Sequence, residues 1–535
     1  MRRRSFLAGV GATALVASCS GPATGTTPSS TATGPMPLAP TPPAGPGPLL
    51  SATQVGAAVD HLDGLVADAM TRSGVPGVAV VVVYQDQIRH AKGYGVRKVG
   101  QVGDVDADTV FQLASLSKPL AATVVAGVVG RGTVAFDDPV ITSNPAFALR
   151  DPYVTANATF ADLLSHRSGL STGAGDLLED MGYDRTYIVT RLNQQPLSAF
   201  RATYNYSNFG FTLGALAAAD AAHLPWSDLA KQTLFTPIGM TSTSYDHADF
   251  AAAANHAALH VPLGGGTWEA RYDRTPDAEA PAGGASSSVR DLGQWLRLLL
   301  AGGSHDGTPL INTDALTVTQ TPHFVNHPPT ASDTRAKFYG LGWNVSYDDQ
   351  GRVSLGHSGA FELGAATAVS LLPGEQLGIV VLTNGAPQGI PEAIAAMFYD
   401  VAAHGTPTVD WVGFLATQFK KILAASAPDV DYRVPPPSPI MIPAGRRTGI
   451  YDNPYYGPVT VAGPDTALTL TMGPAAAPIT VPLTHYNGAT WTFQTFGENA
   501  NGLGGATFTG PTSAGPTTLV LDYYNRTGLG TFTAQ

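Results

Sequence analysis

At 535 residues, the chain is longer than one ordinary domain, so at least two folded domains are expected. Hydrophobic residues make up 44% of it, which is enough for buried cores, and charged residues only 13%. The formal net charge of −11 argues against a nucleic-acid partner, which would require a basic face. No internal apolar run reaches the roughly 18 residues of a membrane-spanning helix, so a soluble protein is expected beyond the N-terminus.

The first residues have the pattern of an export signal. Arg3–Leu7 resembles a twin-arginine signal, and a short apolar core follows over residues 8–16. The segment Val16–Cys19 then resembles a bacterial lipoprotein box. Because Cys19 is the only cysteine, a disulfide within one chain is impossible. We predict that residues 1–19 are a signal and that lipidated Cys19 anchors the protein at the outer face of the cytoplasmic membrane, in the cell envelope.

The following segments predict a linker and the start of a sheet. Residues 20–50 are rich in Pro, Thr, Gly and Ala without helical or strand periodicity, which is typical of a disordered tether. An amphipathic helix is expected over Val55–Met70, and two strands over Gly77–Tyr84 and Gln87–Tyr94.

The middle of the chain, residues 115–302, reads as mainly helical with long polar loops. Strands return near Trp343, Val353, Thr367–Leu372 and Leu377–Leu382, and a helix follows over Pro391–Ala403. Strands at both ends of the segment 51–405 predict an α+β fold with one antiparallel sheet, flanking helices and an inserted helical subdomain. The active site is expected in the cleft between the sheet and the helices.

The last part of the chain has a different pattern. A helix containing Trp411 and a Pro-rich stretch form a predicted connection over residues 406–443. Residues 444–535 then show alternating strands, such as Trp491–Phe493, separated by Gly, Pro and Asn turns. This pattern indicates a small all-β sandwich or barrel, expected to serve packing or oligomerisation rather than catalysis.

Ser115 and Lys118 form the most informative motif of the sequence. Residues three apart share a helix face, so the Ser115 hydroxyl and the Lys118 amine are expected within hydrogen-bond reach at the start of an apolar helix. A serine is a weak nucleophile until a base takes its proton, and a desolvated lysine can be that base. The N-terminus of the helix would also supply N–H groups to a developing oxyanion. The pattern predicts a serine hydrolase.

Two further motifs lie downstream. Tyr206 and Asn208 form a Tyr-x-Asn element in a polar loop before a helical run. His357 and Gly359 form a His-x-Gly element in the second strand region, where a histidine between glycines is less easily explained as a core residue.

The three motifs in this order resemble the active-site elements of the serine β-lactamase and DD-peptidase superfamily. The Tyr-x-Asn version is similar to the branch of class C β-lactamases, D-aminopeptidases and esterases, over about residues 55–405. Matching flanks are Phe111–Lys118, Phe136–Val140, Leu163–Leu170 and Pro281–Gly284. The segment Gly449–Gly457 resembles the lipocalin-like β domain attached to some of these hydrolases.

The resemblance implies a role for each motif residue. Ser115 would attack a carbonyl carbon, and Lys118 and Tyr206 would share the proton transfers, with either as the acylation base. The N–H groups of Ser115 and Ala360 would form the oxyanion hole, beside Gly359. Asn208 would hold the substrate amide and orient Lys118. No metal or cofactor is implied, and the partners expected are a small-molecule or peptide substrate and the membrane, with oligomerisation open.

His357 departs from the pattern of the β-lactamases and most penicillin-binding proteins, which carry a lysine there. A histidine is only partly charged near pH 7, so it is expected to bind a substrate carboxylate more weakly than a lysine does. Cleavage of an ester or a peptide-like amide is therefore favoured over β-lactam hydrolysis. Some DD-peptidases and D-aminopeptidases of the superfamily also carry histidine here, so β-lactamase activity stays an alternative.

Other motifs of the sequence permit different interpretations. Gly169–Gly173 matches the G-x-S-x-G pattern of an α/β-hydrolase with Ser171 as nucleophile, but it follows a helical stretch rather than a strand. His256 and His260 share a predicted helical face, but position 257 is Ala rather than the Glu of a zinc protease, which favours a surface pair. A penicillin-binding sensor with slow deacylation is the non-hydrolytic alternative.

Overall fold

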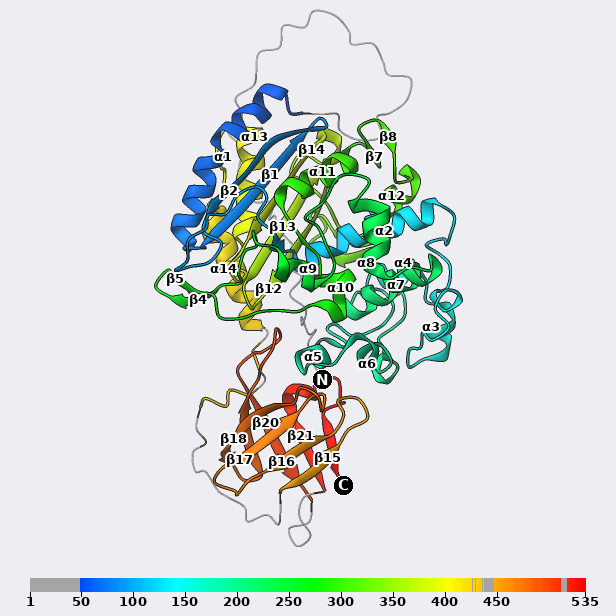
Figure 1. Ribbon diagram of the computed structural model, residues 1–535, viewed down its shortest axis with the longest axis vertical. Coiled ribbons are helices and arrows are strands. Elements are labelled where there is room, and N and C mark those ends of the chain that lie inside the picture. The colour runs from blue at the N-terminus through cyan, green and yellow to red at the C-terminus, as the bar shows by residue number, and fades with distance from the viewer. Residues whose placement is uncertain (1–48, 426, 429, 435, 437–446, 511–516) are drawn as a thin grey trace, which may run out of the picture.

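The computed structural model describes residues 49–425, 427–428, 430–434, 436, 447–510 and 517–535. The predicted signal, Cys19 and nearly all of the predicted linker lie outside these residues. Within them, the chain forms an α+β body and, below it in Figure 1, a β-barrel. No helix in the described ranges has the length and apolarity needed to cross a bilayer.

An eight-stranded sheet in the order β2-β1-β14-β13-β12-β11-β10-β9 forms the centre of the α+β body, and all its paired neighbours are antiparallel. Strand β1 pairs with β14, so the two ends of the body meet in the middle of the sheet. The bounds are β1 Gly77–Tyr84, β2 Gln87–Gly95, β9 Phe324–His327, β10 Lys337–Tyr339, β11 Asn344–Tyr347, β12 Val353–Phe361, β13 Ala365–Leu372 and β14 Leu377–Thr383.

Alternating residues of β1 pack into two different layers, as the period of a strand requires. Val80 and Val82 pack with α1 (Ala52–Ser73) and α13 (Ile390–His404) on one face of the sheet. Val81 and Val83 pack with α2 (Ser117–Gly130) and α11 (Val289–Leu300) on the other. A fully buried run of valines is therefore required in β1, because both faces of the strand are covered (Figure 1).

The helical subdomain lies on the α2 side of the sheet (Figure 1). Its helices are α3 Pro152–Asn157, α4 Phe160–Leu164, α5 Asp176–Asp180, α6 Arg185–Val189, α7 Asn208–Ala221, α8 Trp226–Ala230, α9 His247–Ala252, α10 Ala280–Gly283 and α12 Thr313–Thr319. Two-stranded pairs join β3 Phe111–Gln112 to β6 Ser286–Ser287, β4 Val261–Gly264 to β5 Thr267–Glu269, and β7 Ser304–His305 to β8 Thr308–Pro309.

After α14 (Trp411–Ala425), the chain forms a closed eight-stranded barrel around an aromatic core that includes Trp491 and Phe532. Its strands are β15 Gly449–Asp452, β16 Val459–Ala462, β17 Leu468–Met472, β18 Ile479–Asn487, β19 Thr490–Gln494, β20 Leu503–Thr509, β21 Thr518–Leu521 and β22 Thr531–Ala534. Closure leaves no free strand edge.

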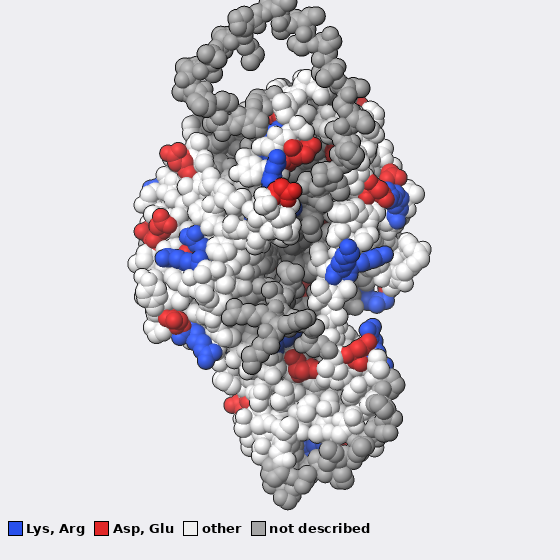
Figure 2. Space-filling view, turned by 180° about the vertical axis from the view of Figure 1, so that it is seen from behind, with Lys and Arg blue, Asp and Glu red and all other residues white. Residues whose placement is uncertain are grey.

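The predicted fold class is confirmed: an antiparallel sheet with flanking helices, an inserted helical subdomain and an all-β C-terminal domain. In the barrel, strand β21 ends at Leu521, and a 3₁₀ turn over Asp522–Tyr524 follows. The surface seen in Figure 2 is mostly uncharged, with basic and acidic side chains in small scattered groups, as the low charged fraction requires.

Candidate active site

Ser115 lies on a tight turn that packs against strands β12 and β13 of the sheet. The turn is a 3₁₀ segment, Ala114–Leu116, directly before α2. Ala114 has φ +49°, a left-handed conformation that is uncommon outside glycine and that points to stored strain at the turn. Leu113 fixes the turn: its N–H donates to the Ala285 carbonyl (2.9 Å), and its carbonyl accepts from Thr367 Oγ1 (2.7 Å). Ser115 therefore lies two residues before the first residue of α2, close to the predicted start of the helix.

Lys118 is fully buried in the first turn of α2, and its amine reaches back to the nucleophile. Nζ lies 3.1 Å from Ser115 Oγ, 2.7 Å from Asn208 Oδ1 and 3.0 Å from the Ala282 carbonyl. Pro119 lies in the same turn, where its missing N–H costs no hydrogen bond. The predicted hydrogen bond between Lys118 and Ser115 is therefore present.

Burial lowers the pKa of Lys118 to about 7, because the charged ammonium loses its water, although Glu279 and Asp176 act in the opposite direction. A substantial fraction of the amine is therefore neutral near pH 7. A neutral amine has a lone pair for the Ser115 proton, and two N–H groups remain for Asn208 and the Ala282 carbonyl.

Tyr206 covers the other side of the lysine. Lys118 Nζ lies 4.6 Å from the centre of the Tyr206 ring. Burial raises the pKa of Tyr206 well above its usual range, and the neighbouring Ser115 side chain acts against that shift. Tyr206 Oη is buried without a well-formed hydrogen bond in the described part of the chain. The phenol is therefore a neutral hydroxyl beside the nucleophile, free to bind a substrate or water oxygen.

Asn208 begins α7, one residue after the N-cap Ser207, whose Oγ accepts from the Gly210 N–H (3.0 Å). This cap fixes the start of the helix and with it the direction of the amide. Oδ1 accepts from Lys118, and Nδ2 donates to Asp176 Oδ2 (3.3 Å). Asn208 therefore connects the base to a carboxylate farther along the cavity.

His357 lies in the middle of β12, and it is nearly fully buried. Nε2 is 2.9 Å from Tyr339 Oη, and Nδ1 is 2.7 Å from the Ser358 carbonyl. Burial and then the nearby Lys118 charge lower the pKa of His357 to about 3, so the ring is neutral near pH 7. Its ring centre is 6.3 Å from that of Tyr206, and the side chain does not line the cavity that contains Ser115.

Gly359 and Ala360 bring β12 against the nucleophile turn. A Cβ at Gly359 would lie 2.1 Å from the Leu113 carbonyl oxygen and 2.3 Å from Thr367 Oγ1. The glycine is required there for close backbone approach. Ala360 lines the cavity beside Ser115, where its N–H is predicted to help bind an oxyanion.

His166 was missed as a site residue, although it lies in one of the flanking segments that match the superfamily. It is buried at φ +60°, with its ring centre 4.4 Å from that of Tyr206 and 4.9 Å from that of Tyr339. Its Nδ1 accepts from the Ser207 N–H (3.2 Å), so the ring is a support for the Tyr206 loop.

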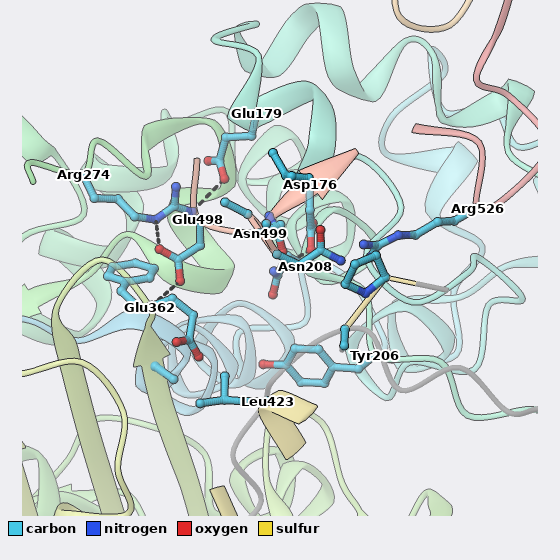
Figure 3. Close-up of a pocket in the computed structure, with 18 of the residues that line it drawn as sticks. Asp176, Glu179, Tyr206, Asn208, Arg274, Glu362, Leu423, Glu498, Asn499 and Arg526 are labelled. Atoms are coloured by element: carbon cyan, nitrogen blue, oxygen red, sulfur yellow. Dashed lines mark hydrogen bonds and ion pairs between the residues drawn. The ribbon is translucent and has the colours of Figure 1, made fainter. Parts of the chain in front are cut away.

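A cavity of about 350 Å³ opens beside Ser115, and much of its wall is acidic (Figure 3). The segments 172–185 and 261–282 contribute Asp176, Glu179, Arg274 and Glu279 to this wall. Glu362 follows β12. These residues come from separate segments of unremarkable composition, so no sequence pattern marks them as one site.

The barrel closes this cavity through the loop between β19 and β20, which brings Glu498 and Asn499 to the wall. Asp180 of α5 holds the loop, accepting from the N–H groups of Glu498 (2.8 Å) and Asn499 (3.1 Å) and from Asn499 Nδ2 (2.9 Å). The Glu362 N–H donates to Glu498 Oε1 (2.6 Å). The barrel thus forms part of the cavity wall, a position that the sequence pattern did not indicate.

The competing motifs do not form sites. Ser171 Oγ donates to Gln195 Oε1 (3.2 Å) in a loop that follows no strand of the central sheet. His256 and His260 are not on a helix, and His260 is fully buried, with Nδ1 2.9 Å from the Asn384 carbonyl and Nε2 accepting from the Val99 N–H (3.0 Å). The surface-pair expectation is therefore wrong. No group of three or more metal-ligating side chains is present among the described residues.

Comparison with known proteins agrees with this geometry. The Beta-lactamase family model matches residues 62–403, more than half of the chain. The chain belongs to the β-lactamase family. This match covers Ser115, Lys118, Tyr206 and His357, so the chain is a serine hydrolase of that family, as predicted.

Several β-lactamase-family relatives are similar along much of the chain. Protein flp of Staphylococcus aureus (strain COL) is 21% identical over 64% of this chain, which spans 66% of that protein. Unguisins hydrolase ungD′ of Aspergillus campestris is 25% identical over 74% of this chain and 76% of its own length. Penicillin-binding protein 4 of Amycolatopsis lactamdurans is 28% identical over 59% of this chain and 82% of its own length.

A solved structure shares the fold, including the second domain. The octameric penicillin-binding protein homologue from Pyrococcus abyssi has a TM-score of 0.56 and 18% identity. The alignment covers 87% of this chain and 98% of that one. The shared fold therefore extends over most of both chains.

Proposed function

We propose that the protein is an exported hydrolase that cleaves an ester or a peptide-like amide through an acyl-enzyme on Ser115. The contact of 3.1 Å between Ser115 Oγ and the buried Lys118 amine carries this proposal. It joins a nucleophile to a base whose pKa, lowered to about 7 by burial, suits proton transfer at neutral pH.

The reaction follows from the contacts. Neutral Lys118 takes the Ser115 proton as Oγ attacks the carbonyl carbon. In this proposal the backbone N–H groups of Ser115 and Ala360, two residues that line the cavity, stabilise the charge on the carbonyl oxygen. The tetrahedral intermediate expels the alcohol or amine, which takes a proton from Lys118 or Tyr206. Water then attacks the acyl-enzyme while Lys118 or Tyr206 accepts one of its protons, and the same groups pass a proton to the departing Ser115 Oγ, which releases the acid and restores the free hydroxyl.

The neutral state of His357 supports esters and amides over β-lactams. A β-lactam or a D-Ala-D-Ala peptide presents a carboxylate, and a histidine with a pKa of about 3 offers it no fixed positive charge. Slow acylation by penicillins stays as the second candidate, because one relative is named a penicillin-binding protein.

Intact-mass spectrometry tests the acyl-enzyme directly. The soluble protein lacking residues 1–19 would be mixed with short-chain esters, D-aminoacyl amides, D-Ala-D-Ala peptides and a cephalosporin. We expect ester or amide turnover, a transient acyl adduct on Ser115, and loss of both in Ser115→Ala but not in Ser171→Ala. Turnover that survives in Ser115→Ala would overturn the proposal, and a lasting penicillin adduct without ester turnover would favour a sensor.

Export is supported by the sequence of residues 1–19 alone. The paired arginines and the Val16–Cys19 segment are typical of a twin-arginine lipoprotein signal. The proposed location is the outer face of the cytoplasmic membrane, with Cys19 as the lipidated first residue. Mass spectrometry of the membrane fraction should show a diacylated Cys19, and an unmodified Cys19 there would overturn this part.

A further inference from the structure

The cavity at Ser115 has more carboxylates than cations. Its charged lining residues are Asp176, Glu179, Glu279, Glu362, Asp431, Glu498, Arg274, Arg433 and Arg526. Arg433 and Asp431 are exposed and form an ion pair with each other (2.7 Å), so their charges cancel. Five carboxylates then remain against two guanidinium groups, with the buried Lys118 amine behind them.

Arg274 is shared among three of these carboxylates. Its Nη2 lies 2.7 Å from Glu179 Oε2 and 2.8 Å from Glu279 Oε1, and its Nε lies 3.9 Å from Glu498 Oε2 (Figure 3). Arg274 is itself buried, and Nη2 makes hydrogen bonds to Glu179 and Glu279 within the wall. It therefore neutralises part of the cluster and leaves acidic oxygens facing the cavity.

Two carboxylates of the wall lack a cationic partner in the described residues. Asp176 is only 7% exposed, and its Oδ1 has no hydrogen-bond partner among them. The same holds for Glu362 Oε1, on the β12 side of the cavity. Burial raises the pKa of Glu362 to about 7, and burial together with neighbouring acids raises that of Asp176 well above its usual range. Such groups are ionised and satisfied when a cation enters among them.

The acidic wall lies close to the reacting bond. Asp176 contacts Asn208 (3.3 Å), which contacts Lys118 (2.7 Å), which contacts Ser115 (3.1 Å). Asn208 is the residue expected to hold the acyl amide, so Asp176 lies on the acyl side of the substrate. A cavity of about 350 Å³ is near the small end of ligand pockets, so it fits a group of amino-acid size.

We infer that the acyl part of the substrate carries a primary ammonium group, which binds between Asp176 and Glu362 under the barrel loop that contains Glu498. This inference rests on the proposed acyl-enzyme function and narrows its substrate class to amine-bearing esters or amides. The barrel then contributes to specificity, because Glu498 holds the Glu362 backbone and adds a carboxylate to the wall. Arg526 also lines the cavity, and its guanidinium could instead bind a negatively charged acyl group. An anionic substrate is therefore the alternative that the experiment must compare with an amine-bearing one.

Three p-nitrophenyl esters of nearly equal size test the inference: 3-aminopropanoyl, butanoyl and succinyl. Their acyl chains end in an ammonium, a methyl and a carboxylate group, and spontaneous hydrolysis is subtracted for each. We expect kcat/KM for the ammonium ester to exceed that for the neutral ester at least tenfold and that for the anionic ester by more. Ser115-dependent turnover with equal rates, or with preference for the methyl or carboxylate ester, would overturn the inference while leaving the proposed function intact.

Substitutions of the two carboxylates test whether they bind the ammonium group. The ratio of kcat/KM for the ammonium ester to that for the neutral ester should fall at least fivefold in Glu362→Gln and in Asp176→Asn. The ratio is taken within each variant, so a loss of folded enzyme cancels. Glu269→Gln, an exposed acid paired with Arg271 outside the cavity, should keep the wild-type ratio. An unchanged ratio in both cavity variants would overturn the assignment, and turnover of none of the esters would overturn the proposed function as well.

Discussion

The Glu498 carboxylate of the barrel accepts a hydrogen bond of 2.6 Å from the backbone N–H of Glu362, which follows the strand beside the nucleophile. The C-terminal domain and the catalytic sheet thus meet inside the cavity rather than at a remote interface. Changes in either domain are therefore expected to alter the chemistry at Ser115.

Removing the base should nearly abolish acylation. We expect Lys118→Ala to lower the rate of acyl-enzyme formation by about 100- to 10,000-fold, the usual contribution of a positioned general base. Lys118→Arg should be similarly impaired, because a guanidinium stays charged and cannot accept the Ser115 proton. The burst of p-nitrophenol in stopped-flow measurements reports this rate, and a normal burst in Lys118→Arg would contradict the assignment.

The acylation rate should rise with pH around neutrality. The Lys118 pKa of about 7 lies below that of a free lysine, so the neutral, proton-accepting form increases as pH rises through 7. A carboxylate at position 208 should stabilise the ammonium and move this midpoint upward. We therefore expect the midpoint of kcat/KM against pH for a neutral ester to be at least one unit higher in Asn208→Asp than in wild type.

Asn208→Leu is the matched control, since it removes the same hydrogen bond without adding charge. It should lower the rate and not raise the midpoint. Glu179 and Glu362 also have pKa values raised to about 7 by burial, which is why a neutral ester is used for the profile. An identical midpoint in Asn208→Asp and wild type would show that Lys118 is not the titrating base.

A methyl group at Gly359 should disrupt the site and the fold together. In Gly359→Ala, the new Cβ would overlap the Leu113 carbonyl and Thr367 Oγ1, which fix the nucleophile turn. We expect a loss of about 1–3 kcal/mol in the free energy of unfolding, as for other overpacked cores, and a large loss of activity. Gly374→Ala, where the added methyl meets no neighbour, should leave both unchanged in denaturant titration and ester assays.

Loss of Asp180 should detach the barrel loop. Asp180→Ala removes the acceptor of the Glu498 and Asn499 N–H groups, and a buried N–H without a partner costs about 1–3 kcal/mol. Hydrogen exchange in peptides spanning residues 496–502 should become at least tenfold faster, and the preference among esters should weaken. Asp180→Asn retains one acceptor oxygen and should show an intermediate effect. Unchanged exchange in Asp180→Ala would mean that other contacts hold the loop.

Much of the fold could be predicted from the sequence because its periodicities are strong. The valine run of β1 and the amphipathic α1 are evident from residue pattern alone. Ser115 and Lys118 could be paired because three-residue spacing near a helix start brings two side chains together. The exact turn could not be predicted, since Ala114 takes a left-handed conformation that its residue type disfavours.

The acidic cavity shows what the sequence did not reveal. Asp176, Glu362 and Glu498 lie on three separate segments and meet only through tertiary packing. The prediction that His260 lies on the surface of a helix is wrong for a related reason. The chain around His256 and His260 forms isolated β-bridges to distant segments instead of a helix. The hydrogen-bond partner of His260, the Asn384 carbonyl, is more than a hundred residues away in the sequence. The spacing of two histidines therefore cannot show whether such a side chain is buried or exposed.

The antiparallel pairing of Val78 with Thr383 has a consequence for synthesis of the protein. Roughly 300 residues separate these partners, so the ribosome has delivered most of the catalytic body before the central strands can join. The wall segment around Glu498 emerges later still. A nascent chain therefore carries its nucleophile long before it can use it, because the strand and the wall segment that complete the site are synthesised much later than Ser115.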